Sequence, residues 1–396
     1  MDKIIKKILS LKIMKKRLYI AVILMLGCFA DVAIASEPEA DSAKVKARFA
    51  YDLNLDMRFD NREFYKSAYT TSMTIFGTRL TPSVGVDLEQ KNGTRHRLMA
   101  GIDVLKNFGA ANVNSELFKE VVFYYDVQKQ LGKTRFEMVA GVFPRKYAEG
   151  SYSQAFYSDS LRFYDNNLEG LLLKFTRPKA YFEVGCDWMG MYDTYSRERF
   201  QIFASGEGKV LPYLSIGYAA SLYHFSCSGV SNGVVDNVLI NPYLRFDLDS
   251  KVDLQALSFR LGWLQAMQND RVHVGHYVFP CGGELMIQVQ KWNVGVRNDM
   301  FVGRDMMPYY NTIDNAGYKY GSLLYMGSPF YRVWDDGRDG VGLADRLEVY
   351  YAPKFGAPYL DLKVSAVFHF DGQKYCGCRQ MVSLNFNLDA LTRGKR

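Results

Sequence analysis

The chain has 396 residues, of which 48% are hydrophobic, 15% aromatic and 23% charged. Disordered segments are poor in aromatic residues, so this composition excludes a disordered chain. It also lacks the Ala, Glu, Lys and Leu bias of a coiled coil. The length allows two soluble domains or one large barrel. The formal net charge of +7 would suit a nucleic-acid partner, but its distribution argues against one.

The first 35 residues have the layout of a secretory signal peptide. Lys and Arg are concentrated in residues 1–17, an apolar run covers 18–30, and residues 33–35 read Ala-Ile-Ala, a small-x-small cleavage pattern. The run is too short for a transmembrane helix. A lipoprotein signal through Cys28 is a weaker alternative, because Met25 stands where such motifs have Leu.

Most of the positive charge belongs to this predicted signal peptide. Residues 1–35 hold seven of the 49 Lys and Arg and two of the 42 Asp and Glu, so the remainder carries 42 basic against 40 acidic residues. A nearly neutral remainder gives no reason to expect nucleic-acid binding.

The rest of the chain alternates apolar and polar residues with a period of two, which is typical of β-strands. In 240–248, Ile, Pro, Leu, Phe and Leu alternate with Asn, Tyr, Arg and Asp. Segments 181–189, 359–370 and 382–389 repeat the pattern. A soluble sandwich also alternates, but these segments are about ten to fifteen residues long, where soluble strands average about five or six.

The connections between the strands alternate between short and long. We predict tight turns at 89–93, 130–132, 177–179, 206–209, 249–252, 290–292 and 353–358. We predict longer loops at 60–69, 107–116, 145–167, 190–198, 226–234, 268–281, 302–342 and 371–378. These connections predict about 16 strands, with 14 to 18 as the range, which is typical of a transmembrane β-barrel with short periplasmic turns and long extracellular loops.

Closure of the sheet has a physical reason. Within a bilayer every backbone N–H and C=O needs an internal partner, so only helices and closed barrels span it. The predicted fold is therefore an all-β, antiparallel, up-and-down transmembrane barrel. Aromatic residues would gather in girdles at the two membrane interfaces. The candidates are Phe49, Tyr51, Tyr124, Tyr125, Trp188, Trp263, Trp292, Tyr350 and Tyr351.

The signal peptide, the alternating body and the last strand at 381–388 together resemble a Gram-negative outer-membrane β-barrel protein of porin-like type. The resemblance implies outer-membrane location, surrounding lipid and insertion by barrel-assembly machinery, and leaves a homotrimer as a candidate assembly. Porin-like chains usually end on an aromatic residue, whereas this chain ends on Arg396. The expected segments are a signal peptide (1–35), a periplasmic segment (36–44), the barrel (45–389) and a polar tail (390–396).

The resemblance also implies that the third long loop, 145–167, folds into the lumen and narrows it. Opposed charges across a water-filled constriction select solutes by charge and size. A self-packed surface loop is the alternative. The constriction candidates are Arg145, Lys146, Glu149, Tyr157, Asp159, Arg162, Tyr164 and Asp165.

Loop 302–342 is the longest, and loops of this length are usually functional or disordered. Its many aromatic residues favour an ordered lid or inward plug. The candidate residues are Arg304, Tyr309, Tyr310, Tyr320, Tyr325, Tyr331 and Arg332. Residues 335–340 place acidic residues beside glycine, but without the spacing and closing Glu of a calcium loop.

The polar faces of the strands should line the lumen. The candidates are Arg97, Asp103, Glu183, Asp187, Arg245, Asp247, Asp253, Arg260, Asp361 and Lys363. Because their charges are mixed, they predict no strong ion selectivity.

Other chemistry has little support, and we predict neither a cofactor nor a metal. Cys227 and Cys281 lie in neighbouring predicted loops, where a disulfide is one alternative. A lipid-modifying enzyme would need a serine and a histidine on the lipid-facing wall, and His224 has Ser221 and Ser226 nearby. The sequence therefore favours a non-enzymatic channel for passive diffusion of small hydrophilic solutes. A plugged structural or surface-binding barrel is the first alternative, and a lipid-modifying enzyme is the less favoured one.

Overall fold

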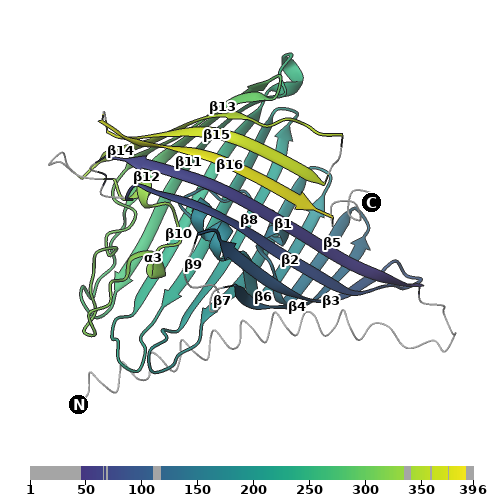
Figure 1. Cartoon of the computed structure of the whole chain (residues 1–396), viewed down its shortest axis with the longest axis horizontal. Coiled ribbons are helices and arrows are strands. Elements are labelled where there is room, and N and C mark those ends of the chain that lie inside the picture. The colour runs from purple at the N-terminus through teal and green to yellow at the C-terminus, as the bar shows by residue number, and fades with distance from the viewer. Residues whose placement is uncertain are drawn as a thin grey trace. The chain divides into compact units, whose positions relative to one another are not determined.

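The computed structural model describes residues 46–65, 67, 70–109, 117–333, 340–356, 359–372 and 374–388. They form one closed barrel of 16 antiparallel strands that follow one another in chain order, with the last strand paired to the first (Figure 1). The predicted all-β barrel and its strand number are confirmed. So is the porin-like outer-membrane architecture that the sequence resembles.

The strands contain between 10 and 19 residues. The first eight are β1 (Lys46–Phe64), β2 (Met73–Glu89), β3 (Arg95–Asn107), β4 (Phe118–Leu131), β5 (Thr134–Pro144), β6 (Asn167–Arg177), β7 (Ala180–Gly190) and β8 (Arg199–Leu211). The other eight are β9 (Leu214–Phe225), β10 (Val235–Asp247), β11 (Ala256–Asp270), β12 (Cys281–Lys291), β13 (Val294–Gly303), β14 (Gly342–Tyr351), β15 (Leu360–Asp371) and β16 (Lys374–Asn387). The helical segments are η1 (Arg145–Tyr147), α2 (Asp159–Tyr164), η2 (Asp249–Lys251), α3 (Gly321–Leu324) and η3 (Pro329–Tyr331).

Several predicted segments lie outside the described residues. They are the signal peptide (1–35), the 36–44 segment, the 390–396 tail and residues 335–339 of the acidic stretch. In the part of the chain that the structure describes, no helix is long and apolar enough to cross a membrane.

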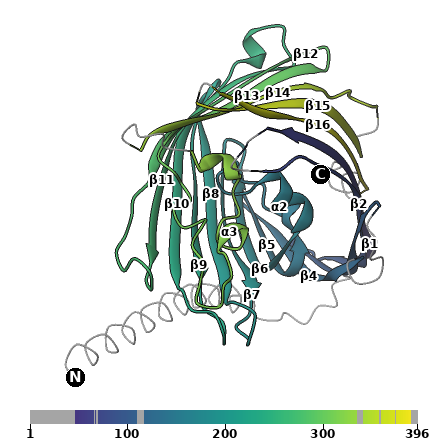
Figure 2. The ribbon, with the colours of Figure 1, turned by 60° about the vertical axis from the view of Figure 1, so that its left-hand side comes forward.

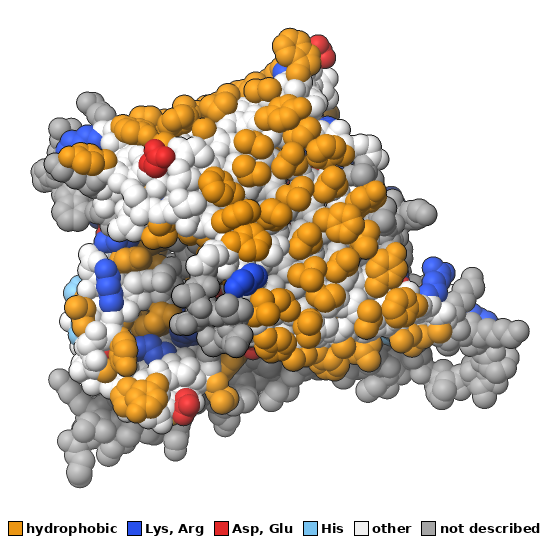
Figure 3. Space-filling model, in the orientation of Figure 1, with side chains coloured by type: hydrophobic (Ala, Val, Ile, Leu, Met, Phe, Trp, Pro, Cys, Tyr) orange, Lys and Arg blue, Asp and Glu red, His pale blue; other side chains and the backbone are white. Residues whose placement is uncertain are grey.

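The period-two alternation places apolar side chains on the outer wall and polar ones inside. In β7, Phe182 and Trp188 are 39% and 43% exposed, whereas Glu183 and Asp187 between them are buried. Figure 3 shows hydrophobic side chains gathered over the outer wall of the strands. An apolar outer belt on a closed sheet is the arrangement that suits hydrocarbon.

Two of the predicted girdle residues point inward instead. Tyr124 is 0% exposed and Tyr350 only 5%. The Tyr124 hydroxyl shares a hydrogen bond of 2.8 Å with the Tyr147 hydroxyl, and Tyr350 accepts one from Gln288. Neighbouring residues of a strand face opposite sides of the sheet, so Tyr124 and Tyr350 face the lumen whereas Tyr125 and Tyr351 beside them face outward.

The turn predicted at 206–209 is wrong, because these residues lie within β8 and the turn follows at 212–213. Gly206, inside β8, leaves room for an aromatic ring of the neighbouring strand. A Cβ at Gly206 would lie 3.0 Å from the ring of Tyr218.

The long loop predicted at 371–378 is also wrong. β15 ends at Asp371 and β16 begins at Lys374, so this connection at the loop end is tight. Gly377 lies at a β-bulge with φ of 149°, where a Cβ would stand 2.3 Å from the carbonyl oxygen of Glu63. Close backbone approach explains this glycine better than a loop does.

Candidate functional site in the lumen

The segment between β5 and β6 folds into the barrel, where Figure 2 shows α2 enclosed by the ring of strands. Its residues bind wall side chains on many strands. Tyr157 donates to Gln201 of β8 at 2.9 Å, Arg260 of β11 donates to the Ser151 carbonyl at 3.3 Å, and Arg58 of β1 donates to the Asp159 carbonyl at 2.7 Å. The segment therefore crosses the lumen.

Buried ion pairs anchor the start of this segment. Arg145 contacts Asp187 at 3.1 Å, and Lys146 reaches Asp52 of β1 at 2.7 Å. Glu183 accepts hydrogen bonds from the backbone N–H of residues 149 and 150 and from the Tyr152 hydroxyl, at 2.9 to 3.0 Å. The predicted lumen residues Glu183 and Asp187 thus hold the inserted loop.

An apolar patch supports the same loop on one side of the lumen. Inward side chains of β1, β3 to β6 and β8 pack with Tyr147 of η1 into a buried cluster. Its members are Ala50, Met99, Val122, Tyr124, Val139, Phe143, Tyr147, Leu168, Leu172 and Phe203. The alternation alone suggested a polar lumen wall, but this part of the wall is apolar.

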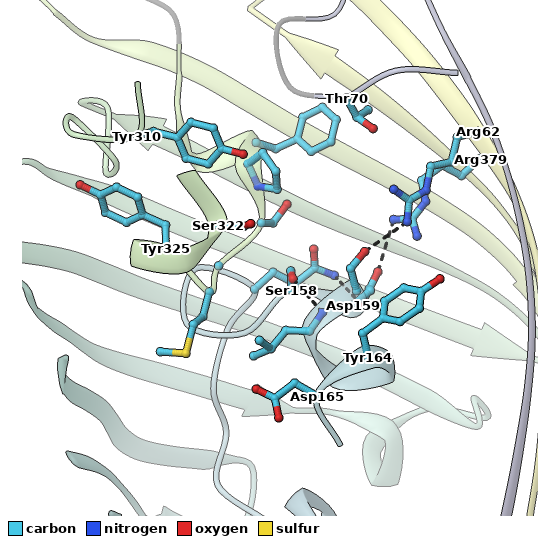
Figure 4. Close-up of a pocket in the computed structure, with 18 of the residues that line it drawn as sticks. Arg62, Thr70, Ser158, Asp159, Tyr164, Asp165, Tyr310, Ser322, Tyr325 and Arg379 are labelled. Carbon is cyan, nitrogen blue, oxygen red and sulfur yellow. Dashed lines mark hydrogen bonds and ion pairs between the residues drawn. The ribbon is translucent and has the colours of Figure 1, made fainter. Parts of the chain in front are cut away.

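The short helix α2 presents one carboxylate, Asp159, to arginines on the opposite wall. Ser158 caps the helix by accepting from the Leu161 N–H at 3.1 Å. Asp159 Oδ2 lies 3.5 Å from Arg379 Nη1 of β16 (Figure 4) and 3.8 Å from Arg346 Nη2 of β14. We call Arg58, Arg346 and Arg379 the wall arginines.

The wall arginines keep Asp159 ionised. Burial alone would raise the pKa of this carboxyl, but the positive charges of Arg346, Arg379 and Arg58 outweigh it and lower the pKa below its ordinary 3.8. The ion pairs that hold α2 are therefore present at neutral pH. They would be lost only as the pH falls through this lowered value.

Two cavities meet at Asp159. One, of about 400 Å³, lies toward the loop end and is lined by Arg62, Phe64 and residues of the β13–β14 loop (Figure 4). The other, of about 300 Å³, lies toward the turn end beside Arg58 and Ser383. Asp159 and Gln154 line both cavities, so these two side chains stand at the junction.

The turn-side cavity has an excess of positive charge. Its five basic side chains are Arg58, Arg162, Arg297, Arg346 and Lys363, and its three acidic ones are Asp56, Asp159 and Glu348. Among the described residues, neither Arg58 nor Arg162 has a carboxylate within ion-pair distance; their guanidinium groups lie over Phe163 and Tyr157 instead, at 5.7 and 5.9 Å from the ring centroids. These two guanidinium groups can therefore attract an anion in the cavity.

The predicted constriction residues divide between the junction and the anchors. Asp159 and Arg162 line the turn-side cavity, and Tyr164 and Asp165 line the loop-side one. Arg145, Lys146 and buried Tyr157 hold the loop to the wall. Glu149, with its side chain 56% exposed, pairs with Lys174 at 3.3 Å.

The remaining lumen candidates lie nearer the turn end. Arg245 pairs with Glu207 at 2.6 Å and with Asp247 at 3.1 Å, and Lys363 pairs with Glu348 at 2.6 Å. Asp361 is exposed near the start of β15. Asp253 is not a lumen residue, because it lies in the β10–β11 turn with a fully exposed side chain.

The loop between β13 and β14 also enters the barrel and packs on the inserted segment between β5 and β6. Met326 accepts through its carbonyl from the Ser158 N–H at 2.9 Å, and Ser328 donates its N–H to the Gln154 carbonyl at 2.7 Å. Tyr325 and Tyr331 donate to Gln268 and Glu284 of the wall at 2.6 and 2.5 Å. Burial raises the pKa of both phenols, so they remain donors at neutral pH.

The other lid candidates differ in position. Tyr309 and Tyr320 are buried, and Arg332 lies 4.0 Å from the ring centroid of half-buried Tyr310. Arg304 is exposed at the start of the loop. The predicted ordered loop is thus found inside the barrel.

Sequence reasoning missed the wall arginines and Arg62. Each stands on the inward face of its strand, so the alternation carried a signal for them. Their convergence on Asp159 depends on pairing between distant strands; Arg379 and Asp159 are 220 positions apart.

Outside the lumen, one outward pair lies near the loop end of the barrel. His224 Nδ1 is 3.6 Å from Asp236 Oδ1, and Arg271 binds the same carboxylate at 2.6 Å. Ser226 follows β9, whereas Ser221 is buried on the inward face. Cys227 and Cys281 are free thiols. Within the described residues, no group of three or more potential ligands could hold a metal ion.

Comparisons with known proteins give a partial family match and several distant structures. A family model described as lipid A 3'-O-deacylase-type matches residues 42–226, which is less than half of the chain. No curated protein matches the sequence significantly. The chain is similar to OpdL of Pseudomonas aeruginosa, with a TM-score of 0.49 and 11% identity over 86% of this chain and 98% of that one. It is also similar to OprD of the same organism, with a TM-score of 0.45 and 10% identity over 89% and 100%.

Proposed function

We propose that the protein is an outer-membrane channel for passive diffusion of small hydrophilic solutes, with a preference for anions. Two inserted loops narrow its lumen to the passage beside α2. The observation that carries the proposal is the basic lining of the turn-side cavity, including Arg58 and Arg162, which have no carboxylate within ion-pair distance among the described residues. In a narrow passage with low-dielectric walls, fixed positive charge raises the local concentration of anions.

Purified protein in planar bilayers tests this function. We expect stepwise conductance and, in a KCl gradient, a reversal potential of the sign that chloride preference produces. Changing both Arg58 and Arg162 to Gln should lower the chloride-to-potassium permeability ratio roughly two- to threefold, since two charges leave the passage. Arg177→Gln is the matched control, because Arg177 is exposed at the end of β6 and contacts Thr134. Absence of conductance, or a reversal potential of the sign that potassium preference produces, would contradict the proposal.

A second candidate is hydrolysis of an acyl ester at the outer wall. It is favoured by the partial match to the deacylase-type family and by the outward His224–Asp236 pair. A histidine oriented by a carboxylate can activate a serine hydroxyl, and Ser226 stands two positions after His224, just beyond β9. Among the described residues, however, no hydrogen bond joins a serine hydroxyl to His224, so this candidate ranks second.

Release of fatty acid from acylated lipid in protein-containing vesicles tests this candidate. Ser226 Oγ would attack the ester carbonyl while His224 takes the proton, the alcohol would leave with that proton, and water would release the acid. Both His224→Ala and Ser226→Ala should then abolish release. His276→Ala, in an exposed loop, is the control. Release no greater than in protein-free vesicles would rule out the enzyme.

A further inference from the structure

The contacts of α2 differ in strength between its two ends. Near its C-terminal end, Arg79 donates to the Phe163 carbonyl and is itself held by Asp103 at 2.6 Å, with both side chains no more than 1% exposed. At the N-terminal end, Asp159 meets Arg379 and Arg346 at 3.5 and 3.8 Å, with its side chain 27% exposed. Direct ionic hydrogen bonds are about 2.7 to 2.9 Å long, so the second set is loose.

The backbone at Asp159 is fixed independently of its side chain. Arg58 donates to the Asp159 carbonyl at 2.7 Å. Among the described residues, the carboxylate has one further contact, a donation of 3.4 Å from Gln154 Nε2. Rotation of this one side chain would therefore break its contacts with Arg346 and Arg379 without moving the helix.

The carboxylate stands where the two cavities meet, and Gln154 lines them with it. The carboxylate faces Nη1 of Arg379 and Nη2 of Arg346. Asp60 holds Nε and Nη2 of Arg379, at 3.0 and 2.7 Å, and Asp299 holds Nη1 of Arg346, at 3.0 Å. The two nitrogens that face Asp159 are therefore the ones that an anionic solute would need in order to pass from one cavity to the other. We propose that Asp159 is a tethered counter-ion, which keeps the junction closed for most of the time, and that a solute oxyanion lengthens the openings by replacing it on Arg346 and Arg379. This inference rests on the proposed channel function and adds the chemistry that opens it.

The replaced group is a carboxylate, so the solute must present anionic oxygen to two guanidinium groups. Carboxylates and phosphates both do so, often by paired hydrogen bonds, whereas chloride cannot. The opening of the channel should therefore depend on the kind of anion and not on ionic strength alone.

Single-channel recording of Asp159→Asn tests the inference. In potassium chloride we expect the variant to stay open several-fold longer than the wild type and to favour anions more strongly. Potassium acetate and potassium phosphate at equal ionic strength should lengthen the openings of the wild type but not those of the variant. A response to only one of these salts assigns the solute group to carboxylate or to phosphate. Asp193→Asn, an exposed acid in the β7–β8 loop, is the matched control.

Gln154→Ala provides a second variant in case Asp159→Asn does not insert. It removes the other side chain at the junction and should raise the conductance while keeping the response to acetate. A conducting, anion-preferring wild type whose open times match those of Asp159→Asn would overturn the counter-ion and leave the channel standing. Silence of the wild type and both variants would overturn the two together.

Discussion

Arg79 and Asp103 show how a single ion pair can place a loop that begins far from it in the chain. Asp103 accepts from Arg79 Nε and Nη2 and from Asn167 Nδ2, at 2.6 to 3.0 Å. Arg79 then donates to the Phe163 carbonyl at the end of α2. A charge buried this deeply needs all of its partners, because desolvation outweighs an incomplete set of hydrogen bonds.

Loss of Asp103 should therefore destabilise the barrel. Asp103→Ala leaves Arg79 buried without its carboxylate, and we expect the free energy of unfolding to fall by about 3 to 5 kcal/mol. Urea denaturation, followed by the shift in gel migration between unfolded and folded barrel, measures the change. Asp253→Ala removes a fully exposed turn carboxylate and should leave the midpoint unchanged. Equal midpoints for the two variants would contradict the anchoring role.

The candidate residues were predictable in kind more than in position. The sequence singled out Asp159 because it lies in a charged, aromatic loop, and the structure places it at the junction of the cavities. It did not distinguish Asp159 from Lys146, which anchors the loop to Asp52. That difference depends on which strand lies opposite each side chain, and no local pattern encodes it.

The two inserted loops behave as one packed element inside the barrel. Residues of the β13–β14 loop such as Met306, Leu324 and Tyr325 bury apolar side chains against the wall and against Phe156 of the first loop. Arg197 of the β7–β8 loop pairs with buried Asp314 and so holds the part of the β13–β14 loop around Asp314. Extensive apolar burial makes the long loop an ordered part of the interior.

Shortening the β13–β14 loop should widen the channel. Replacing residues 309–332 by a short Gly-Ser linker removes one lining of the loop-side cavity, and we expect the single-channel conductance to increase several-fold, since a plug would no longer narrow the lumen. Bilayer recording measures it. A similar replacement of 192–195, in the exposed part of another loop, is the control. If the shortened protein conducts like the wild type, the loop does not limit the passage.

At the scale of the whole molecule, the period-two pattern and the alternation of short and long connections were enough to predict the barrel and its strand number. Two of the predicted connections, 206–209 and 371–378, were wrong, and glycines lie inside strands at both places. Gly206 makes room for the ring of Tyr218, and Gly377 lets β16 approach Glu63 of β1. Both contacts join different strands, so only the folded sheet distinguishes these glycines from turn residues.

The pairing of β1 with β16 also bears on the order of folding. Asn385 donates to Asn54 across this seam at 3.1 Å, although the two residues are 331 positions apart. Every other strand pair joins neighbours in the chain. Contacts between such distant residues form slowly, because ordering the intervening chain costs entropy before the contact contributes. The seam is therefore expected to close last, and a nascent chain lacking its final strand would retain two unsatisfied edges in the bilayer.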